Sequence, residues 1–576
     1  MRITKRIFSL LLTVALLVSV LCACNTPTTP DQTSNPDTTD ATTPEETTPE
    51  TTTTADPLTP PATPAQKITS VYITCGTSAI ETFAAAELKW YFAKKNVTIS
   101  EDGLKIELTI DDTRAKPNGY RITSDENGVV IAGGNERGLA YGLYGFLENV
   151  LGVHLYSPDT TTVDDGDVMI GGGVLDVFEP VFEVLNNPWH PIDGLPEKNG
   201  GNPQSPAIKT LALNAITGVG ATVPCLTDPE SLSKAVTVVK NYLRVVSDID
   251  TLNLIPSSDE ETYCTCENCA LVCEEEGSPA GMYVRFLNAL TEELSLDYPD
   301  LKYATVARAY LKTAPKITKL SNRVTVRFDT EKCHISHPIN DESCPEMSAI
   351  AESMKSWGAN GASIHVEYGL TSTKDFIPVF ANLGSLRANM QFFAECGVDS
   401  INFSGNIVCP TGEFGELRVY LLSKLLLNPT MSEEEYYDYM DSFLEAYYGE
   451  GWMYIRQFID LTTELSADGH QTADGSPFDA ITKEEYAEHA AAIEDMWDKA
   501  QSLANNFINN REDYVKRARF QWRYIKLCLA PNAEAAQALI TDAASNPRVG
   551  WRNAQWNVDT KLSDLNLSPL EWVYKS

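Results

Sequence analysis

The stretch NERGLAYGLYGFLENVLG, residues 135–152, decides how the first folded part of this chain is built. Its apolar residues recur at every third or fourth position, which predicts an amphipathic helix, and Gly152 stands where a left-handed residue would end that helix. The preceding stretch GVVIAGG, residues 128–134, predicts a short buried strand. A strand that leads directly into such a helix indicates a layer of mixed α/β structure.

The rest of residues 67–175 fits the same prediction. We expect further strands at 70–74, 105–110 and 120–124 and a helix at 79–94, which together form a small α/β sandwich. The pattern of residues 128–152 resembles the domain that precedes the catalytic barrel in family 67 alpha-glucuronidases and family 20 beta-hexosaminidases. That resemblance implies a supporting domain beside a barrel, and carbohydrate as the partner.

The first residues have the pattern of a bacterial lipoprotein signal. A basic start and an apolar run at 7–20 lead to the box Leu21-Cys22-Ala23-Cys24. We expect a signal peptide at 1–23, acylation of Cys24, and a disordered Thr/Pro-rich tether at 24–66. The protein is then extracytoplasmic and held at the cell membrane by its lipid anchor only, because the apolar run is too short to span a bilayer. An ordinary secretory signal is the alternative.

The charge of the chain argues against one class of partner. The formal net charge is −35, and no run of Lys and Arg interrupts the acidic surface. Such a surface repels the phosphates of nucleic acids and the head groups of anionic lipids. We therefore expect no nucleic-acid partner.

Residues 176–429 alternate short apolar runs with amphipathic segments. The strands that we predict there are 181–186, 208–213, 221–226, 251–256, 302–307, 323–328, 362–367 and 400–404. This alternation is typical of a (β/α)8, TIM-like barrel. We expect the barrel to be degenerate at its first two strands, because residues 187–220 are hardly long enough for two crossover helices. Residues 430–576 predict an α-helical domain with helices at 433–447, 452–465, 483–506, 511–529 and 533–543.

Several motifs resemble the bacterial domain-of-unknown-function family 4838. They are CTCENC at 264–269, FGELRVYLLSKLLLNP at 414–429 and YYG at 447–449. The resemblance covers residues 175–460. It implies an architecture like that of glycoside hydrolases, without an established activity or assigned catalytic residues.

The catalytic residues of a barrel lie at the carboxyl ends of its strands. Asp259 and Glu260 follow the fourth predicted strand, and Glu367 ends the seventh. Glycosidic cleavage needs one carboxylic acid to protonate the leaving oxygen, and a second carboxylate or the acetamido group of the substrate to stabilise the cationic centre. The Asp259-Glu260 pair resembles the pair of family 20 hexosaminidases, which implies that Glu260 is the acid. A surface loop without function is the alternative for this pair.

Aromatic faces and amide groups can bind sugars. The residues that we predict to contact a sugar are Asn187, Trp189, His190, Tyr368, Asn406 and Glu413. A packed corner is the alternative for Trp189 and His190, and helix-dipole complementarity is the alternative for Glu413. The sequence therefore predicts a glycoside hydrolase that acts on an extracellular polysaccharide or glycan. A noncatalytic carbohydrate-binding lipoprotein and a structural envelope protein remain open.

The sharpest local motif is a group of closely spaced cysteines. Cys264, Cys266, Cys269 and Cys273 can surround one tetrahedral Zn²⁺, with His334 and His337 as further candidate ligands. Without Cys22 and Cys24, eleven of the thirteen cysteines remain, so at least one cannot pair within the chain. A structural Zn²⁺, a disulfide and free thiols remain open. We expect no cofactor for catalysis.

Overall fold

The computed structural model describes residues 59–157, 159–182, 184–185, 208–220, 223–246, 249–257, 262–330, 332–372, 377–405, 413–473, 475–504 and 511–545. The predicted signal peptide, Cys24 and most of the tether lie outside these residues. Among the described helices, none combines the length and the apolar character that a membrane span requires.

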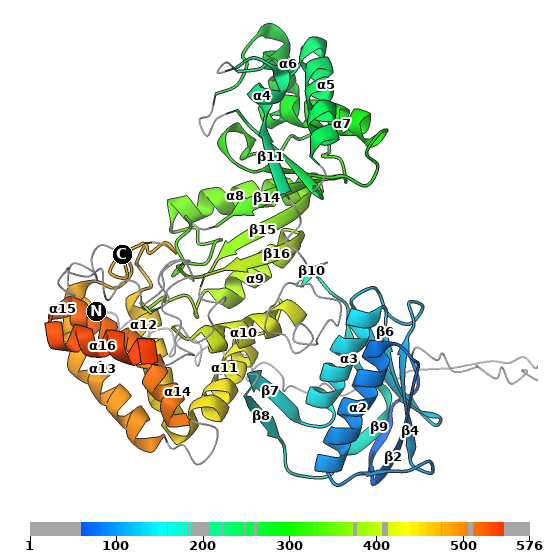
Figure 1. The fold of residues 1–576 in the computed structure, drawn as a ribbon, viewed down its shortest axis with the longest axis vertical. Coiled ribbons are helices and arrows are strands. Elements are labelled where there is room, and N and C mark those ends of the chain that lie inside the picture. The colour runs from blue at the N-terminus through cyan, green and yellow to red at the C-terminus, as the bar shows by residue number, and fades with distance from the viewer. Residues whose placement is uncertain are drawn as a thin grey trace, which may run out of the picture. The chain divides into compact units, whose positions relative to one another are not determined.

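The first domain is a seven-stranded sheet with two helices on one face (Figure 1). The strand order is β1-β9-β5-β6-β4-β2-β3, with β2, β4 and β6 parallel and β5 antiparallel to both of its neighbours. A short hairpin, β7 with β8, follows the second helix. This is the α/β sandwich that we predicted. The elements are β1 Thr63–Lys67, β2 Ser70–Cys75, α2 Ala79–Lys94, β3 Thr98–Ile99, β4 Leu104–Ile110, β5 Tyr120–Asp125, β6 Gly128–Gly133, α3 Glu136–Asn149, β7 Val153–Ser157, β8 Thr160–Val163 and β9 Met169–Phe178.

The predicted helix of residues 135–152 is α3, and its sequence explains how closely it packs on the sheet. Asn135 is the N-cap, and its Oδ1 atom accepts a hydrogen bond of 2.8 Å from the N–H of Gly138. Leu139 and Leu143 of this helix are fully buried. A Cβ atom at Gly138 would collide with the carbonyl oxygen of Gly119, so this glycine permits the close approach.

The second sheet is parallel and has the order β10-β16-β15-β14-β13-β12-β11. Strands β11 to β16 lie side by side in chain order, and the first strand, β10, pairs with the last, as in a singly wound barrel. No pairing joins β10 to β11 within the described residues, so the barrel is open at the corner that we predicted to be degenerate. The strands are β10 Val184–Leu185, β11 Ile208–Ala212, β12 Thr251–Ile255, β13 Lys302–Val306, β14 Val324–Asp329, β15 Ser363–Gly369 and β16 Val398–Ser404.

One predicted barrel strand is wrong. Of residues 221–226, the structure describes 223–226, and these form coil and a turn. Pro224 has no N–H to donate to a strand ladder, and Asp228 caps a helix that begins at Pro229. The helices of this part are α4 Leu213–Thr217, α5 Pro229–Val245, α6 Glu267–Glu276, α7 Ala280–Ser295, η1 Ala309–Leu311, α8 Pro345–Asn360 and α9 Leu386–Glu395.

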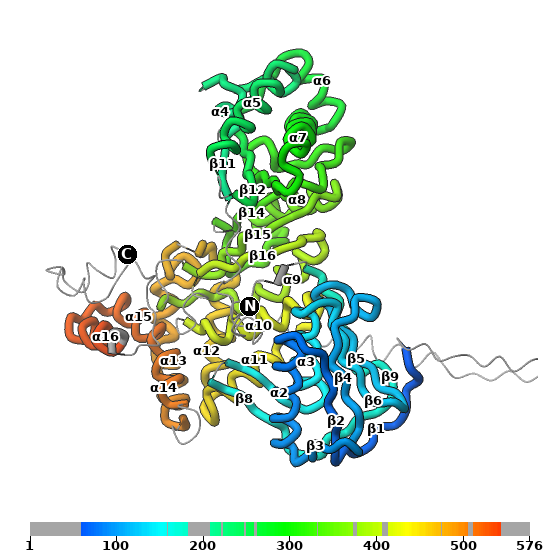
Figure 2. Tube along the Cα trace, turned by 45° about the vertical axis from the view of Figure 1, so that its right-hand side comes forward, coloured from blue at the N-terminus to red at the C-terminus, as the bar shows by residue number. Residues whose placement is uncertain are grey.

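The remaining described residues are mainly helical, as we predicted. Helices α12 and α13 pack against each other (Figure 2), and Trp497 is buried between them against Phe458. The expected helix 511–529 is divided into two at Arg519. The elements are α10 Gly415–Leu427, α11 Glu433–Tyr448, η3 Gly449–Gly451, α12 Trp452–Leu465, α13 Lys483–Leu503, α14 Arg511–Ala518, α15 Phe520–Leu529 and α16 Ala533–Ser545.

Candidate functional site

A row of polar side chains lies across the carboxyl-terminal half of strands β14, β15 and β16. Burial alternates along β15, so Val366 is buried while His365 and Glu367 are partly exposed on the opposite face. The strand register places Glu367 opposite Asn402 of β16 and His365 opposite Arg327 of β14. Three neighbouring strands therefore present their polar groups on one face of the sheet.

Glu367 is the centre of this row. Its Oε1 atom is paired with Nη2 of Arg327 and lies 3.1 Å from Nε2 of His365, and its Oε2 atom accepts a hydrogen bond of 2.7 Å from Asn402. The other ring nitrogen of His365, Nδ1, lies 2.7 Å from the hydroxyl of Ser400. The carboxylate is thus held in place from three strands.

These contacts also set the protonation state of Glu367. Burial raises the pKa of the carboxyl, but hydrogen bonds from His365 and Asn402 and the charges of His365 and Arg327 outweigh burial and hold the pKa at about 2. The side chain keeps 28% of its surface exposed. Glu367 is therefore an accessible, ionised carboxylate at neutral pH, which suits a nucleophile or a stabiliser of positive charge rather than a proton donor.

Most of the other predicted contacts with substrate lie outside the described residues, and they stay predictions. These are Asp259, Glu260, Asn187, Trp189, His190 and Asn406.

Tyr368 and Glu413 are described, and both are buried. The hydroxyl of Tyr368 accepts a hydrogen bond of 2.6 Å from Asn389, and its ring packs against Phe393 of α9. Glu413 pairs with the buried Arg418 at 2.7 Å, and burial raises the pKa of Glu413 to about 7 although Arg418 opposes the rise. Neither side chain has the exposed surface that the predicted contact with a sugar would need.

Four cysteines form a cluster around the start of α6. The sulfur atoms of Cys225, Cys264, Cys266 and Cys269 all lie within 4.8 Å of one another. Cys225 takes the place that we predicted for Cys273, which lies one helical turn beyond Cys269 and is not part of the group.

The cluster has the chemistry of a candidate metal centre. The N–H of Cys269 and the neighbouring thiols lower the pKa of Cys266, the N-cap of α6, to about 7. Cys225 lies 3.7 Å from both Cys266 and Cys269, well beyond the length of an S–S bond, and the described cysteines form no disulfide. The donor set of four thiols matches a tetrahedral structural site.

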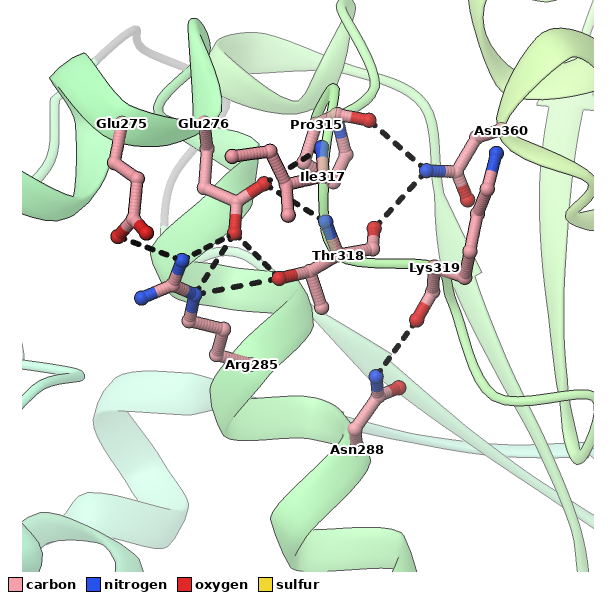
Figure 3. A network of polar contacts seen from close by, with 9 residues as sticks. All are labelled: Glu275, Glu276, Arg285, Asn288, Pro315, Ile317, Thr318, Lys319 and Asn360. Carbon is pink, nitrogen blue, oxygen red and sulfur yellow. Dashed lines mark hydrogen bonds and ion pairs between the residues drawn. The ribbon is translucent and has the colours of Figure 1, made fainter.

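A buried polar network holds the other end of α6 (Figure 3). The carboxylate of Glu276 accepts hydrogen bonds from Arg285 of α7 at 2.8 and 2.5 Å, and from the backbone N–H groups of Ile317 and Thr318 at 3.1 and 2.9 Å. The Thr318 hydroxyl donates to the same carboxylate. Helix α6, which carries Cys269 and is capped by Cys266, is therefore fixed to α7 and to the loop that precedes β14.

Three residues of these sites were not predicted from the sequence. Arg327 and Asn402 stand at alternate positions of apolar strands, and this periodicity could have indicated that they share a face with Glu367. Nothing in the spacing of Cys225, far from Cys264 in sequence, indicates that it joins the cluster. His334 and His337 lie with His470 instead of with these four cysteines.

The central part of the chain is similar to one known family. Residues 200–460 match the family described as "Domain of unknown function (DUF4838)", which confirms the resemblance that we predicted from the sequence motifs. No curated protein matches the chain.

Solved structures with a low similarity to the chain include three enzymes. A GH138 enzyme described as targeting pectin rhamnogalacturonan II has a TM-score of 0.38 and 10% identity, and the match covers 82% of this chain and 90% of that one. A beta-N-acetylhexosaminidase from Bacteroides fragilis has a TM-score of 0.30 and 11% identity over 73% and 95% of the two chains. A chitobiase from Flavobacterium johnsoniae has a TM-score of 0.33 and 10% identity over 84% and 94%.

Proposed function

We propose that this protein is a lipoprotein, anchored through Cys24 outside a bacterial cell, that hydrolyses glycosidic bonds in a polysaccharide or glycan. The observation that carries the proposal is the environment of Glu367. A carboxylate that is ionised, partly exposed and fixed by Arg327, His365 and Asn402 lies at the end of a parallel barrel strand, where barrel enzymes keep their catalytic groups. The acidic tether would hold the folded domains away from the membrane.

The two carboxyl groups needed for such a reaction would have different roles. The low pKa of Glu367 suits it to stabilise the cationic centre, or to attack that centre as a nucleophile. The proton for the leaving oxygen must then come from another acid, and we assign that role to Glu260, with Asp259 beside it in sequence. Arg327, His365 and Asn402 are positioning residues for Glu367.

We infer that the four clustered cysteines bind a structural Zn²⁺. Asp259 and Glu260 lie between the end of β12 and Cys264 in the sequence, so a metal bound by Cys264 and its partners would restrain the segment that carries the proposed acid. Thiolates from two separate segments would also tie the loop before α5 to the start of α6. Cys266 is exposed, so Cys266→Ser should fold and yet lose one equivalent of zinc. Equal zinc content in this variant and the wild type would refute the assignment.

The activity is tested with the full-length chain on a panel of aryl glycosides that includes N-acetylhexosaminides and glucuronides. Glu367→Gln should lower kcat/KM about 10²- to 10⁴-fold on whichever substrate the wild type cleaves. The control is Glu395→Gln, which changes an exposed glutamate of α9 and should leave the rate unchanged.

Three outcomes distinguish the proposed hydrolase from a noncatalytic protein and define the role of Glu367. If Glu367→Gln cleaves as fast as the control, the role of Glu367 is refuted. Restoration of Glu367→Ala activity by azide, with formation of a glycosyl azide, would identify Glu367 as the nucleophile. If the wild type cleaves none of the substrates but binds glycan, the protein is a noncatalytic carbohydrate-binding lipoprotein instead.

A further inference from the structure

Three of the seven histidines of the chain meet where the loop after β14 touches the loop between α12 and α13. The ring centroids of His334 and His470 are 4.5 Å apart, and those of His337 and His470 are 5.1 Å apart. The backbones of the two loops are joined beside the rings, because His334 forms a β-bridge with Thr472. Imidazole nitrogens are among the commonest ligands of transition-metal ions, so a group of three histidine rings is a candidate metal site.

A thiol and a carboxylate complete this group. Nδ1 of His334 lies 3.3 Å from the sulfur of Cys344, and that sulfur lies 3.6 Å from Oε2 of Glu346. One ligand atom from each of His334, Cys344, Glu346 and His470 lies within 4.8 Å of all the others. Ligands at roughly 2.0 to 2.3 Å from a tetrahedral ion are roughly 3.5 Å apart, so small side-chain movements would suffice to close the site.

We propose that His334, His470, Cys344 and Glu346 bind one divalent transition-metal ion. A set of two imidazoles, one thiolate and one carboxylate fits Zn²⁺ best, because zinc accepts nitrogen, sulfur and oxygen ligands in a tetrahedral geometry. This site shares no ligand with the four-cysteine cluster.

His337 is a second, independent sign of a ligand site. It is 5% exposed, and its Nδ1 atom lies 2.9 Å from Asp341. Its Nε2 atom is buried and has no hydrogen-bond partner among the described residues. A buried ring nitrogen without a partner is costly in an ordinary core, whereas a further nitrogen donor is useful beside a metal. His337 is therefore the residue best placed to bind the ion in addition to the four proposed ligands, or in place of the weakest of them.

The ion would stabilise the surroundings of Glu367. The loop that supplies His334 starts at Thr330, whose N–H donates a hydrogen bond of 3.0 Å to the carbonyl oxygen of Glu367. At its far side the loop is held by the bond of 2.8 Å from the N–H of Ile335 to the carbonyl of Gln471. A metal shared by His334 and His470 would fasten the helical region to the loop that contacts β15.

The test measures the metal content of the full-length chain after dialysis against Zn²⁺. His470→Gln should bind one equivalent of zinc less than the wild type. The matched control is His489→Gln, which removes a histidine of α13 whose ring hydrogen-bonds to the preceding turn of its own helix, and it should keep the wild-type content. Equal zinc content in His470→Gln and the wild type would overturn the proposal, as would a wild type that binds no zinc.

A second measurement covers the case in which His470→Gln does not fold. Glu346 and Glu342 are both exposed on the same segment, so each can be changed to glutamine without disturbing a core. Competition with a chromophoric chelator should show zinc bound at least tenfold more weakly at one site in Glu346→Gln, and unchanged in Glu342→Gln. Identical titrations for the two variants would refute the site. Cys266→Ser removes the zinc of the four-cysteine cluster, which is a different site. The loss of each site is therefore measured separately, and neither measurement depends on hydrolytic activity.

Discussion

Replacing Glu276 by glutamine should reduce the local stability of helices α6 and α7 by about 3 kcal/mol, whereas the same change at Glu275 should have almost no effect. Both glutamates bind Arg285, but the side chain of Glu276 is fully buried and that of Glu275 is 56% exposed. The comparison therefore sets a buried carboxylate against an exposed one, both paired with the same arginine.

The magnitude follows from the contacts of the carboxylate. Burial raises the pKa of Glu276, but the hydrogen bonds from Thr318, Arg285 and the N–H of Ile317 outweigh burial and bring the pKa from 4.5 to about 2. A depression of about 2.5 pKa units corresponds to about 3 kcal/mol, close to the range of about 3–5 kcal/mol for breaking a buried ion pair. A glutamine side chain has only one acceptor oxygen. Its NH₂ group would therefore point at some of the hydrogen-bond donors that now surround the carboxylate, and those donors would lose their acceptor. For the exposed Glu275 pair, we expect less than about 0.5 kcal/mol.

Hydrogen exchange of the amides in α6 and α7 measures this directly. At pH 7, the slowest amides of Glu276→Gln should exchange roughly a hundredfold faster than those of the wild type, while Glu275→Gln stays near the wild type. Because the folded pKa is depressed, the stabilisation is complete above pH 4.5 and is lost as the pH falls toward 2. The difference in amide exchange rate between the wild type and Glu276→Gln should therefore become smaller as the pH is lowered. If both variants exchange alike at pH 7, the reasoning is wrong.

Three further predictions concern the candidate active site, the core and the anchor. His365→Ala removes a hydrogen bond and a positive charge that lower the pKa of Glu367, so the acidic limb of the kcat/KM profile should move to higher pH; an unmoved limb would show that Glu367 does not control it. Arg418→Met leaves the carboxyl of Glu413 buried without its partner, and we expect a loss of about 3–5 kcal/mol in the free energy of unfolding, measured by denaturant titration. Cys24→Ala should abolish the incorporation of labelled palmitate, and label that persists in the variant would exclude acylation at this position.

The elements of this protein were predictable wherever they depend on residues close together in the chain. Helix α2 has the bounds that we predicted, because Ser78 and Glu81 form a complete capping box and apolar residues follow at helical spacing. The open corner of the barrel was predictable for a similar reason, since segment length and Gly and Pro content limit what can cross between two strands. These local effects act within a few residues and so are visible in the sequence.

The groups around each candidate site were decided by tertiary structure alone. Glu367 could be chosen from its place at the end of a strand, but Arg327 and Asn402 reach it only through the register of three parallel strands. Cys225, and not Cys273, completes the cluster, because the loop before α5 brings Cys225 close to the start of α6, whereas Cys273 lies one turn further along that helix. Ligand sets of this kind depend on which distant segments meet. That depends on long-range strand pairing and loop packing, and no pattern within one segment specifies it.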